Sequence, residues 1–386
     1  MSAGRQVSAW LSDRTGWSGV VSALNTHRVP RKSFMFYLGG ITLFLLTIQV
    51  ASGILLVLYY RPDAEMAYPS VERIVGELPY GNLIRSFHVW ASDLFVVCLL
   101  AHLFTILVRR SFRPPHELTW LSGVVSLVLG IGMAFTGGIL PWNEAAYTNA
   151  RVGSELAKYV PFFGGGLQRF MRGGDEVTSA TLGHAYGFHV AALPAAITVL
   201  VALHLFFLSR KPAALPAPPL FEDEPKAVEK KAEDADDESE EEEAAEKPSE
   251  ELATAKATEA ALEQDTIPLY PDFFVRLALP ITGVLVLIMT LAVFADRPLG
   301  VAADAALPSV GAHPPWYLLP FHELVRIAPK ELLGIDGARF LVGTASLLGL
   351  IAVFLPFIDR RGSKVTAYVA WSLLAVLIIL SALALN

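Results

Sequence analysis

The sequence predicts an all-α polytopic membrane protein, built from a four-helix bundle and three further transmembrane helices. Two observations predict the class. The chain has 386 residues, of which 53% are hydrophobic, and its mean hydropathy is +0.48. Its apolar residues gather into seven runs of about 20 residues or more, the length that crosses a bilayer as a helix. A third observation, one long acidic segment after the fourth run, predicts the division into four and three.

We expect the seven spans at 34–60, 82–108, 118–140, 184–209, 273–295, 338–358 and 364–385. The preceding residues 1–33 carry five basic side chains, and their apolar positions are scattered rather than gathered as in a signal peptide. We interpret 1–33 as an amphipathic segment at the membrane surface.

Orientation is predicted from the basic residues near the span ends. Arg and Lys gather in the N-terminal segment, in the 109–117 loop, at Arg210 and Lys211, and around 360–364. These positions all fall on one side, which should be cytoplasmic. We expect a multi-pass protein of the bacterial cytoplasmic (inner) membrane, with its N-terminus in the cytoplasm.

The predicted linker, 212–266, separates the four-helix part (34–211) from the three-helix part (267–386). Its stretch from Glu222 to Asp265 holds 19 acidic residues and 5 lysines. Such a composition cannot bury a core, so we expect a disordered tether. Docking of a basic partner is the alternative. The chain as a whole carries −7, so the rest of the protein is basic, although nothing in the pattern calls for a nucleic acid.

Four histidines lie in two of the spans at matched spacings. His88 and His102 are 14 residues apart, and His189 and His204 are 15 apart. At about 1.5 Å of rise per residue, each spacing covers roughly 21 to 22 Å and returns to nearly the same helix face. Two helices facing each other could therefore hold two stacked groups, one near each membrane surface.

Neutral imidazole is a common axial ligand of haem, and ligation by two histidines leaves no open position for oxygen or substrate. We therefore predict a di-haem bundle for electron transfer, with these four histidines as iron ligands. A lone membrane histidine is more often satisfied by a neighbouring helix or serves a proton relay, as in a transporter or scaffold. That alternative does not require paired spacings.

Glycines repeat the spacing of the histidines. Gly39 and Gly53, and likewise Gly123 and Gly137, are 14 residues apart in the first and third spans. We expect each to make room for a macrocycle, with ordinary small-residue packing as the alternative. Arg85, three residues before His88, is placed for a haem propionate, or else it snorkels to the interface. The single cysteine, Cys98, lies mid-span, and no C-x-x-C-H sequence is present, so the haems should be non-covalent.

Several strings carry a resemblance to a known family: FYLGGIT at 36–42, IRSFH at 84–88, ELTWLSGVV at 117–125, LPWNEAAY at 140–147 and PPWYLLPFHELVRIAPKELLG at 314–334. The chain resembles cytochrome b of cytochrome bc complexes, and the b-six-f type more than the mitochondrial type. Its N-terminal part is similar to cytochrome b-six and its C-terminal part to subunit IV, joined in one chain.

The resemblance implies haem bL between His88 and His189 and haem bH between His102 and His204. It further implies oxidation of quinol on the periplasmic side and reduction of quinone on the cytoplasmic side, coupled to proton translocation. The implied partners are a Rieske iron–sulfur protein, a c-type cytochrome, the membrane quinone pool and a second copy of the complex.

Two positions depart from the family pattern. The Pro-Glu-Trp-Tyr motif of quinol oxidation reads Pro-Pro-Trp-Tyr at 314–317, so a carboxylate that could take a proton is missing. The candidate substitutes are Glu323, Glu144, Tyr317 and His322. Our hypothesis is that Glu323 or Glu144 takes the proton, the alternative being that both are rim charges.

The second departure is Tyr37, which stands where the b-six-f type has a cysteine that binds an additional haem covalently. A thioether needs a thiol, so we expect two b haems and no third. On the same side Arg28, Arg210 and Asp272 are candidates for binding or protonating quinone, unless they are interfacial anchors.

Because Pro315 replaces the motif carboxylate, there is an alternative redox function. In it, the same di-haem core passes quinol electrons to a non-Rieske module such as a multihaem cytochrome. In either reading the chain is a subunit of a quinol oxidoreductase.

Overall fold

The computed structural model describes Trp10 and residues 28–31, 34–210, 266–304, 314–360 and 363–385. Within these residues six helices are long and apolar enough to span a membrane: Met35–Val57, Gly81–Val108, Glu117–Gly137, Ser179–Ser209, Leu269–Phe294 and Lys364–Ala384. The predicted class, an all-helical polytopic membrane protein, is confirmed. Helices satisfy every backbone polar group internally, which is why long apolar runs take this form in lipid.

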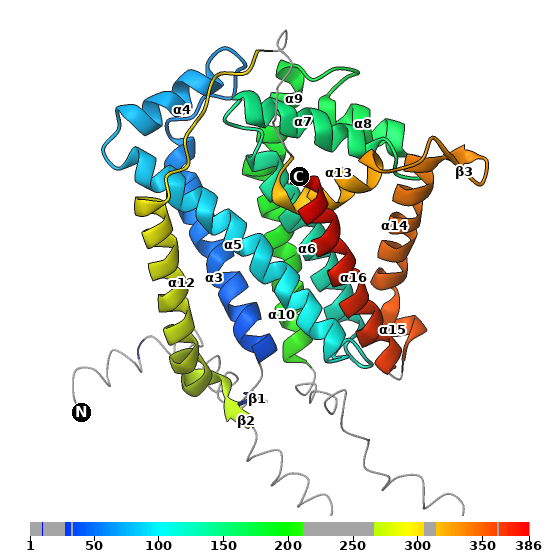
Figure 1. The fold of residues 1–386 in the computed structure, drawn as a ribbon. Helices are drawn as coiled ribbons and strands as arrows, with labels where there is room; N and C mark the ends of the chain where they lie inside the picture. The colour runs from blue at the N-terminus through cyan, green and yellow to red at the C-terminus, as the bar shows by residue number, and fades with distance from the viewer. Residues whose placement is uncertain are drawn as a thin grey trace, which may run out of the picture.

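Two antiparallel helix pairs form the four-helix part, which is seen in blue to green in Figure 1. Helix α3 (Phe34–Val57) packs along α5 (Gly81–Val108), and α6 (Glu117–Gly137) packs along α10 (Leu193–Ser209). Contacts between α5 and α6 join the two pairs. The buried core between the helices is aliphatic and aromatic, with Leu45, Phe95, Ile197 and Ile288 at its centre.

The fourth span begins five residues before the predicted 184, at Ser179. Small and polar residues lower the hydropathy of this first part, but Thr178 closes a capping box with Thr181 and starts α9 (Ser179–Gly187). The helix continues through a single π-turn, η1 (Phe188–Ala192), into α10. The amide of Leu193 donates to the carbonyl of Phe188, one residue further back than in an α-helix, immediately before Pro194.

The predicted sixth span, 338–358, is wrong in extent. The structure has a 17-residue helix, α14 (Gly337–Val353), a break at Phe354, and the short α15 (Leu355–Ile358). The break follows from Pro356, which has no amide hydrogen for the carbonyl of Ala352 four residues earlier. The indole Nε1 of Trp120 on α6 donates to the carbonyls of Ala352 and Val353 instead, at 3.0 and 3.1 Å.

The C-terminal helices lie on two sides of the four-helix part. Helix α12 (Phe274–Phe294) packs against α3 and α5, whereas α16 (Lys364–Ala384) packs against α5 and α13 (Leu319–Arg326). Figure 1 shows α12 on one flank and α14 and α16 on the other. The segment after α12 is tied to the N-terminal part: Glu144 donates its amide to the carbonyl of Val301 at 3.0 Å, and Tyr68 donates its hydroxyl to that of Gly300 at 2.7 Å.

Short helices gather at one end of the bundle (Figure 1): α4 (Ala67–Gly76), α7 (Glu144–Ala157), α8 (Gly164–Arg172), α9 and α13. Near them η4 (Trp316–Leu318) precedes α13, and β3 (Glu331–Leu332) pairs with β4 (Ile335–Asp336). At the other end β1 (Arg28–Pro30) pairs antiparallel with β2 (Thr266–Pro268), which leads through η3 (Leu269–Phe273) into α12.

Most of the predicted surface segment 1–33 and almost all of the predicted acidic linker 212–266 lie outside the described residues. The proposed domain boundaries stay predictions.

Candidate functional site

The first histidine pair joins α5 to η1. The ring centroids of His88 and His189 are 6.3 Å apart, and their planes are inclined at 82°. This separation suits two imidazoles on opposite sides of one metal ion, because each metal–nitrogen bond is about 2 Å long and each centroid lies behind its nitrogen. The rings come from segments 101 positions apart in the sequence.

The second pair, His102 on α5 and His204 on α10, lies further along the same two helices, and the two rings are near each other. The structure thus brings the four predicted ligands together as two pairs.

Hydrogen bonds to Nδ1 orient three of the four imidazoles. His189 Nδ1 donates to the carbonyl of Met133 at 3.0 Å, and His204 Nδ1 donates to that of Thr119 at 2.9 Å. A carbonyl can only accept, so each of these rings carries its proton on Nδ1 and leaves Nε2 with a free lone pair. Bonds of this kind fix the ring and raise the basicity of a metal ligand.

His88 reaches the same state through a hydroxyl. Ser52 Oγ lies 2.8 Å from His88 Nδ1 and donates its own proton to the carbonyl of Ile48 at 2.7 Å. The hydroxyl therefore accepts from the ring. His102 differs, since the backbone of Met35 is near its ring but Nδ1 makes no well-formed hydrogen bond.

Each predicted glycine faces one histidine ring across its helix pair. A Cβ built on Gly39 would lie 3.2 Å from Cε1 of His102, and one on Gly53 would lie 3.3 Å from Cε1 of His88. In the other pair, the corresponding distances are 3.1 Å from Gly123 to His204 and 2.6 Å from Gly137 to His189. A side chain at any of the four would press on the carbon next to Nε2. The glycines therefore make room for the ligand rings, while contact with a macrocycle stays a prediction.

The donor set fits haem iron better than a bare ion. Within the described ranges, no three His, Cys, Asp or Glu side chains come close enough to hold a metal ion. Two imidazoles on opposite sides suit an iron whose remaining ligands come from a porphyrin.

Comparison with known proteins gives the family. Residues 24–212 match the model described as Cytochrome b/b6/petB, and residues 303–386 match the model described as Cytochrome b(C-terminal)/b6/petD. A cytochrome bc complex cytochrome b subunit of Chlorobaculum thiosulfatiphilum is 30% identical over 365 residues, covering 93% of this chain and 74% of the relative. The chain belongs to the cytochrome b family.

Cytochrome b6 of Synechococcus elongatus is 35% identical over 207 residues, which are 53% of this chain and 96% of that protein. A solved structure, "Hyperthermophilic respiratory Complex III", has the same fold, with a TM-score of 0.70 and 20% identity over 98% of this chain and 97% of that one. The predicted family is confirmed, with matches to both the N-terminal and the C-terminal part in one chain. Proteins of the cytochrome b family bind haem b and act in electron transport.

Arg85 of this cytochrome b is 9% exposed, and its guanidinium donates to the carbonyl of Arg297 at 2.6 Å. It lies one helical turn before His88 on the same helix. The prediction that it binds a propionate stays open. In the structure, Arg85 and Arg297 meet where α5 contacts the segment after α12.

Asp93 is a charged residue that the sequence reasoning missed. It forms an ion pair with Arg297 and accepts a hydrogen bond from Trp316 Nε1 at 3.0 Å. Arg297 also lies over the ring of Trp90, 3.7 Å from its centroid. The sequence does indicate this residue, because Asp93 is the lone carboxylate of an apolar span and lies five residues after His88. Carboxylates inside membrane spans are commonly functional.

The sequence-predicted groups around the Pro-Pro-Trp-Tyr motif have different partners. Tyr317 lies near Asp93, and burial followed by the charge of Asp93 raises the pKa of its phenol. Glu323 on α13 is 1% exposed, and both of its oxygens accept from Arg326, at 2.6 and 2.7 Å. Those bonds hold the pKa of Glu323 below its ordinary value, with His322 adding a smaller effect in the same direction.

Glu144 begins α7 and is half-buried, next to its N-cap Asn143. Its amide binds the segment after α12 through Val301. Its role as a proton acceptor stays a proposal, like that of Glu323.

At the other end of the bundle, Arg28 donates to Thr266 Oγ1 at 2.9 Å, which places it on the short sheet leading into η3. Asp272 is exposed in η3. Arg210 stands at the end of α10 over the ring of Phe206. Tyr37 stacks on Phe273, with centroids 5.2 Å apart. Arg28, Asp272 and Tyr37 thus belong to one region, where α3 meets the start of α12.

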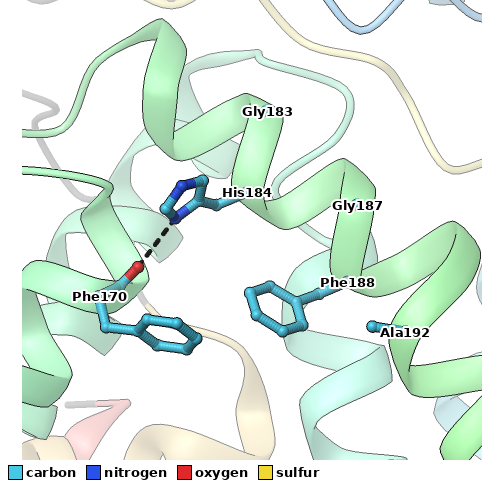
Figure 2. A pocket seen from close by; sticks show the side chains of 6 residues that line it. All are labelled: Phe170, Gly183, His184, Gly187, Phe188 and Ala192. Carbon is cyan, nitrogen blue, oxygen red and sulfur yellow. Dashed lines mark hydrogen bonds between the residues drawn. The ribbon is translucent and has the colours of Figure 1, made fainter.

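A hollow of about 310 Å³ lies beside the π-turn that carries His189. Figure 2 shows Phe170 and Phe188 next to one another in its lining, with His184 above them, and the centroids of the two phenyl rings are 5.4 Å apart. Ring Nδ1 of His184 lies 2.9 Å from the carbonyl of Phe170 and links α9 to α8. This fifth histidine belongs to the packing of the surface helices.

Proposed function

We propose that this chain is the di-haem cytochrome b subunit of a bc-type quinol oxidoreductase. In this proposal His88 and His189 hold haem bL, and His102 and His204 hold haem bH, both non-covalently. When bound, the haems supply a path for single electrons across the membrane. One observation carries the proposal. At each site two imidazoles come from facing helices, and a glycine on a neighbouring helix lies against each ring.

The protein's own part is to present and orient ligands. Carbonyls of Met133 and Thr119 and the hydroxyl of Ser52 hold three rings with Nε2 available. The residues Gly39, Gly53, Gly123 and Gly137 keep the helices free of side chains at the ligand rings. Arg85 is proposed to bind a propionate, since it is the buried cation nearest in sequence to His88.

Quinol oxidation is assigned to the end of the bundle that carries Tyr317, Glu323 and Glu144, which we take as periplasmic. Quinone reduction is assigned to the opposite end, near Arg28, Arg210 and Asp272. The expected topology, with a cytoplasmic N-terminus in a bacterial inner membrane, would couple the two reactions to proton translocation. Rieske and c-type cytochrome subunits are the proposed partners, in a homodimeric complex. The predicted parts 34–211 and 267–386 would then be the di-haem domain and the subunit IV-like domain.

The experiment is a haem titration of the purified subunit and of His88→Ala and His102→Ala variants. We expect two non-covalent haems in the wild type and one in each variant, with a different haem lost each time. A wild-type protein with one haem, or a variant that retains both, would contradict the assignment of ligands.

Glu323 and Glu144 are tested by their carboxamide variants in the intact complex. A lower quinol-oxidation rate in Glu323→Gln or in Glu144→Gln would identify that residue as part of the proton path. Unchanged rates in both variants would remove these two residues from the proposal.

A second candidate function is favoured by Pro315, which replaces the carboxylate of the family motif. In this alternative the same core passes quinol electrons to a non-Rieske module, such as a multihaem cytochrome. The subunits that co-purify with the chain distinguish the two: a Rieske protein supports the first, and a multihaem protein without Rieske supports the second.

A further inference from the structure

We propose that Asp93 is the carboxylate that accepts a proton from quinol beside Trp316. This inference rests on the proposed function and deepens it, because it names a proton acceptor on a helix where the motif does not lie.

The position of Asp93 is the first support. Its Oδ1 accepts from Nε1 of Trp316 at 3.0 Å. Trp316 follows Pro315 directly, so a carboxylate from α5 stands next to the point where the family motif has its own. Tyr317 is close enough to Asp93 for the carboxylate charge to raise the pKa of the phenol, in addition to the larger effect of burial. The motif has lost a carboxylate, and α5 supplies one to the same group of aromatic side chains.

The charge around Asp93 is the second support. A carboxylate inside a membrane helix is costly unless it is paired, and Arg297 provides the partner. The side chain of Asp93 is 28% exposed and that of Arg297 is 35% exposed, so neither is sealed off. The other charged groups at this junction are Arg85, bound to the Arg297 carbonyl, and Asp296, whose Oδ1 lies 3.4 Å from Asn82 Nδ2.

The second contact of Arg297 makes protonation of Asp93 feasible. Its guanidinium lies over the ring of Trp90, and Trp90 Nε1 donates to the carbonyl of Ala295 at 3.0 Å, which fixes that ring. Cation–π contact with Trp is among the stronger forms of this interaction. The guanidinium therefore keeps a partner while Asp93 is neutral.

Glu323 is less suited to this role. Arg326 binds both of its oxygens, and the carboxylate is 1% exposed. Asp93, by contrast, is partly exposed beside the indole of the motif.

The reaction balances as follows. Oxidation of quinol to quinone releases two protons and two electrons. One quinol O–H bond breaks as an O–H bond forms on Asp93, and this proton then passes to water at the outer surface. The other proton goes to a base of the partner that carries the iron–sulfur centre. The two electrons go to the two one-electron acceptors that the proposed function supplies. General-base assistance of this kind contributes about 10²- to 10⁴-fold to a rate.

The test uses the purified complex with Asp93→Asn and Asp93→Glu in the full chain, with Glu72→Gln on α4 as the control. Rates are measured from pH 5 to 9 with a short-chain benzoquinol and a short-chain naphthoquinol. We expect Asp93→Asn to lower kcat at least tenfold, with KM changed less than twofold and the dependence of kcat on pH flattened at its acid end. Asp93→Glu should restore part of the rate with a shifted pH profile.

A second readout does not depend on turnover. Infrared difference spectra of the quinol-reduced minus oxidised complex should contain a protonated-carboxyl band that is absent from Asp93→Asn and displaced in Asp93→Glu. If Asp93→Asn fails to assemble, the displacement in Asp93→Glu decides the question alone.

Wild-type rates, pH profile and carboxyl band in Asp93→Asn would overturn the inference and leave Asp93 as a counter-ion of Arg297. A slower Asp93→Asn with an unshifted pH profile and an intact carboxyl band would do the same. A wild-type complex that oxidises neither quinol would instead contradict the proposed function itself.

Discussion

Gly137 approaches its histidine more closely than the other three glycines approach theirs. A Cβ at Gly137 would lie 2.6 Å from Cε1 of His189 and 3.0 Å from Nδ1. The Met133 carbonyl, one turn earlier on the same helix as Gly137, holds the ring through Nδ1, and the backbone of the π-turn fixes its Cα. The imidazole therefore has little freedom to move away from a new methyl group.

Substitution of Gly137 by alanine should cost the protein one haem. Because packed interiors tolerate little added volume, the methyl group would displace the ring from its ligating position. We expect Gly137→Ala to retain about half of the haem of the wild type, measured by reduced-minus-oxidised difference spectra. Gly132→Ala is the matched control on the same helix, because a Cβ there meets only Leu193 Cδ1 at 3.6 Å. Full haem content in Gly137→Ala would show that the site adapts.

Replacing Ser52 by alanine should raise the reduction potential of one haem only. The hydroxyl accepts a hydrogen bond from His88 Nδ1, which makes this imidazole a stronger electron donor to iron. Without the acceptor the ligand donates less, and the reduced state becomes relatively more stable. Potentiometric titration should show one of two components moved upward. Thr47→Ala, on the same helix with its hydroxyl bonded to Leu43, should leave both components in place.

Much of the site could be predicted because its spacing is local. The 14- and 15-residue intervals between histidines, repeated by the glycines, follow from helix geometry alone and need no tertiary information. Asp93 could not be assigned in this way. Its partners Arg297 and Trp316 are 204 and 223 positions away, and only the packing of the segment after α12 against α5 brings them together.

The errors in the predicted spans have equally specific causes. Hydropathy alone placed the start of the fourth span too late, because the capped turn at Ser179 is polar. It also extended the sixth span through Pro356, whereas proline ends the hydrogen-bond ladder at this point and Trp120 takes over the carbonyl. The mean hydropathy of a run of residues contains no information about a helix cap or about a hydrogen bond from a distant indole.

Trp120→Phe should weaken the contact between α6 and the α14–α15 break. The variant leaves the carbonyls of Ala352 and Val353 without the indole donor at 3.0 and 3.1 Å. Loss of a partner for a buried polar group costs about 1 to 3 kcal/mol. We expect a lower Tm in detergent with an unchanged haem spectrum. Trp371→Phe, whose ring packs edge-on against Phe104, is the comparison for loss of indole volume. Equal Tm values for the two variants would argue against the hydrogen bond.

All haem should be removable by acidified acetone. Tyr37 offers no thiol for a thioether, and the free thiol of Cys98 lies in the middle of α5. We expect two haems per chain in the extract and no haem absorbance in the precipitated protein. Haem that stays with the precipitate would disprove the prediction.

The junction of α7 and α8 should lose stability in acid. Burial raises the pKa of Glu155, but hydrogen bonds from Lys158 and Arg172 outweigh it and hold the pKa below its ordinary value. Arg172 Nη2 lies 2.9 Å from Glu155 Oε1, and its Nε donates to Ser154 at 2.8 Å. A carboxylate with a lowered pKa stabilises the fold fully above the pKa of the unfolded chain, near 4.3. The stabilisation is lost as the pH falls through the lower folded pKa.

The test of this pH dependence is the Tm difference between the wild type and Glu155→Gln. We expect the difference to be constant from pH 7 to about 5 and to shrink toward zero below about 4, because protonated Glu155 carries no more charge than glutamine. Glu77→Gln is the control, since Glu77 and Arg73 form an ion pair whose side chains are 72% and 57% exposed. Such a pair contributes little at any pH, so Glu77→Gln should follow the wild type throughout. A Tm difference for Glu155→Gln that persists undiminished in acid would assign the effect to packing at α7 rather than to charge.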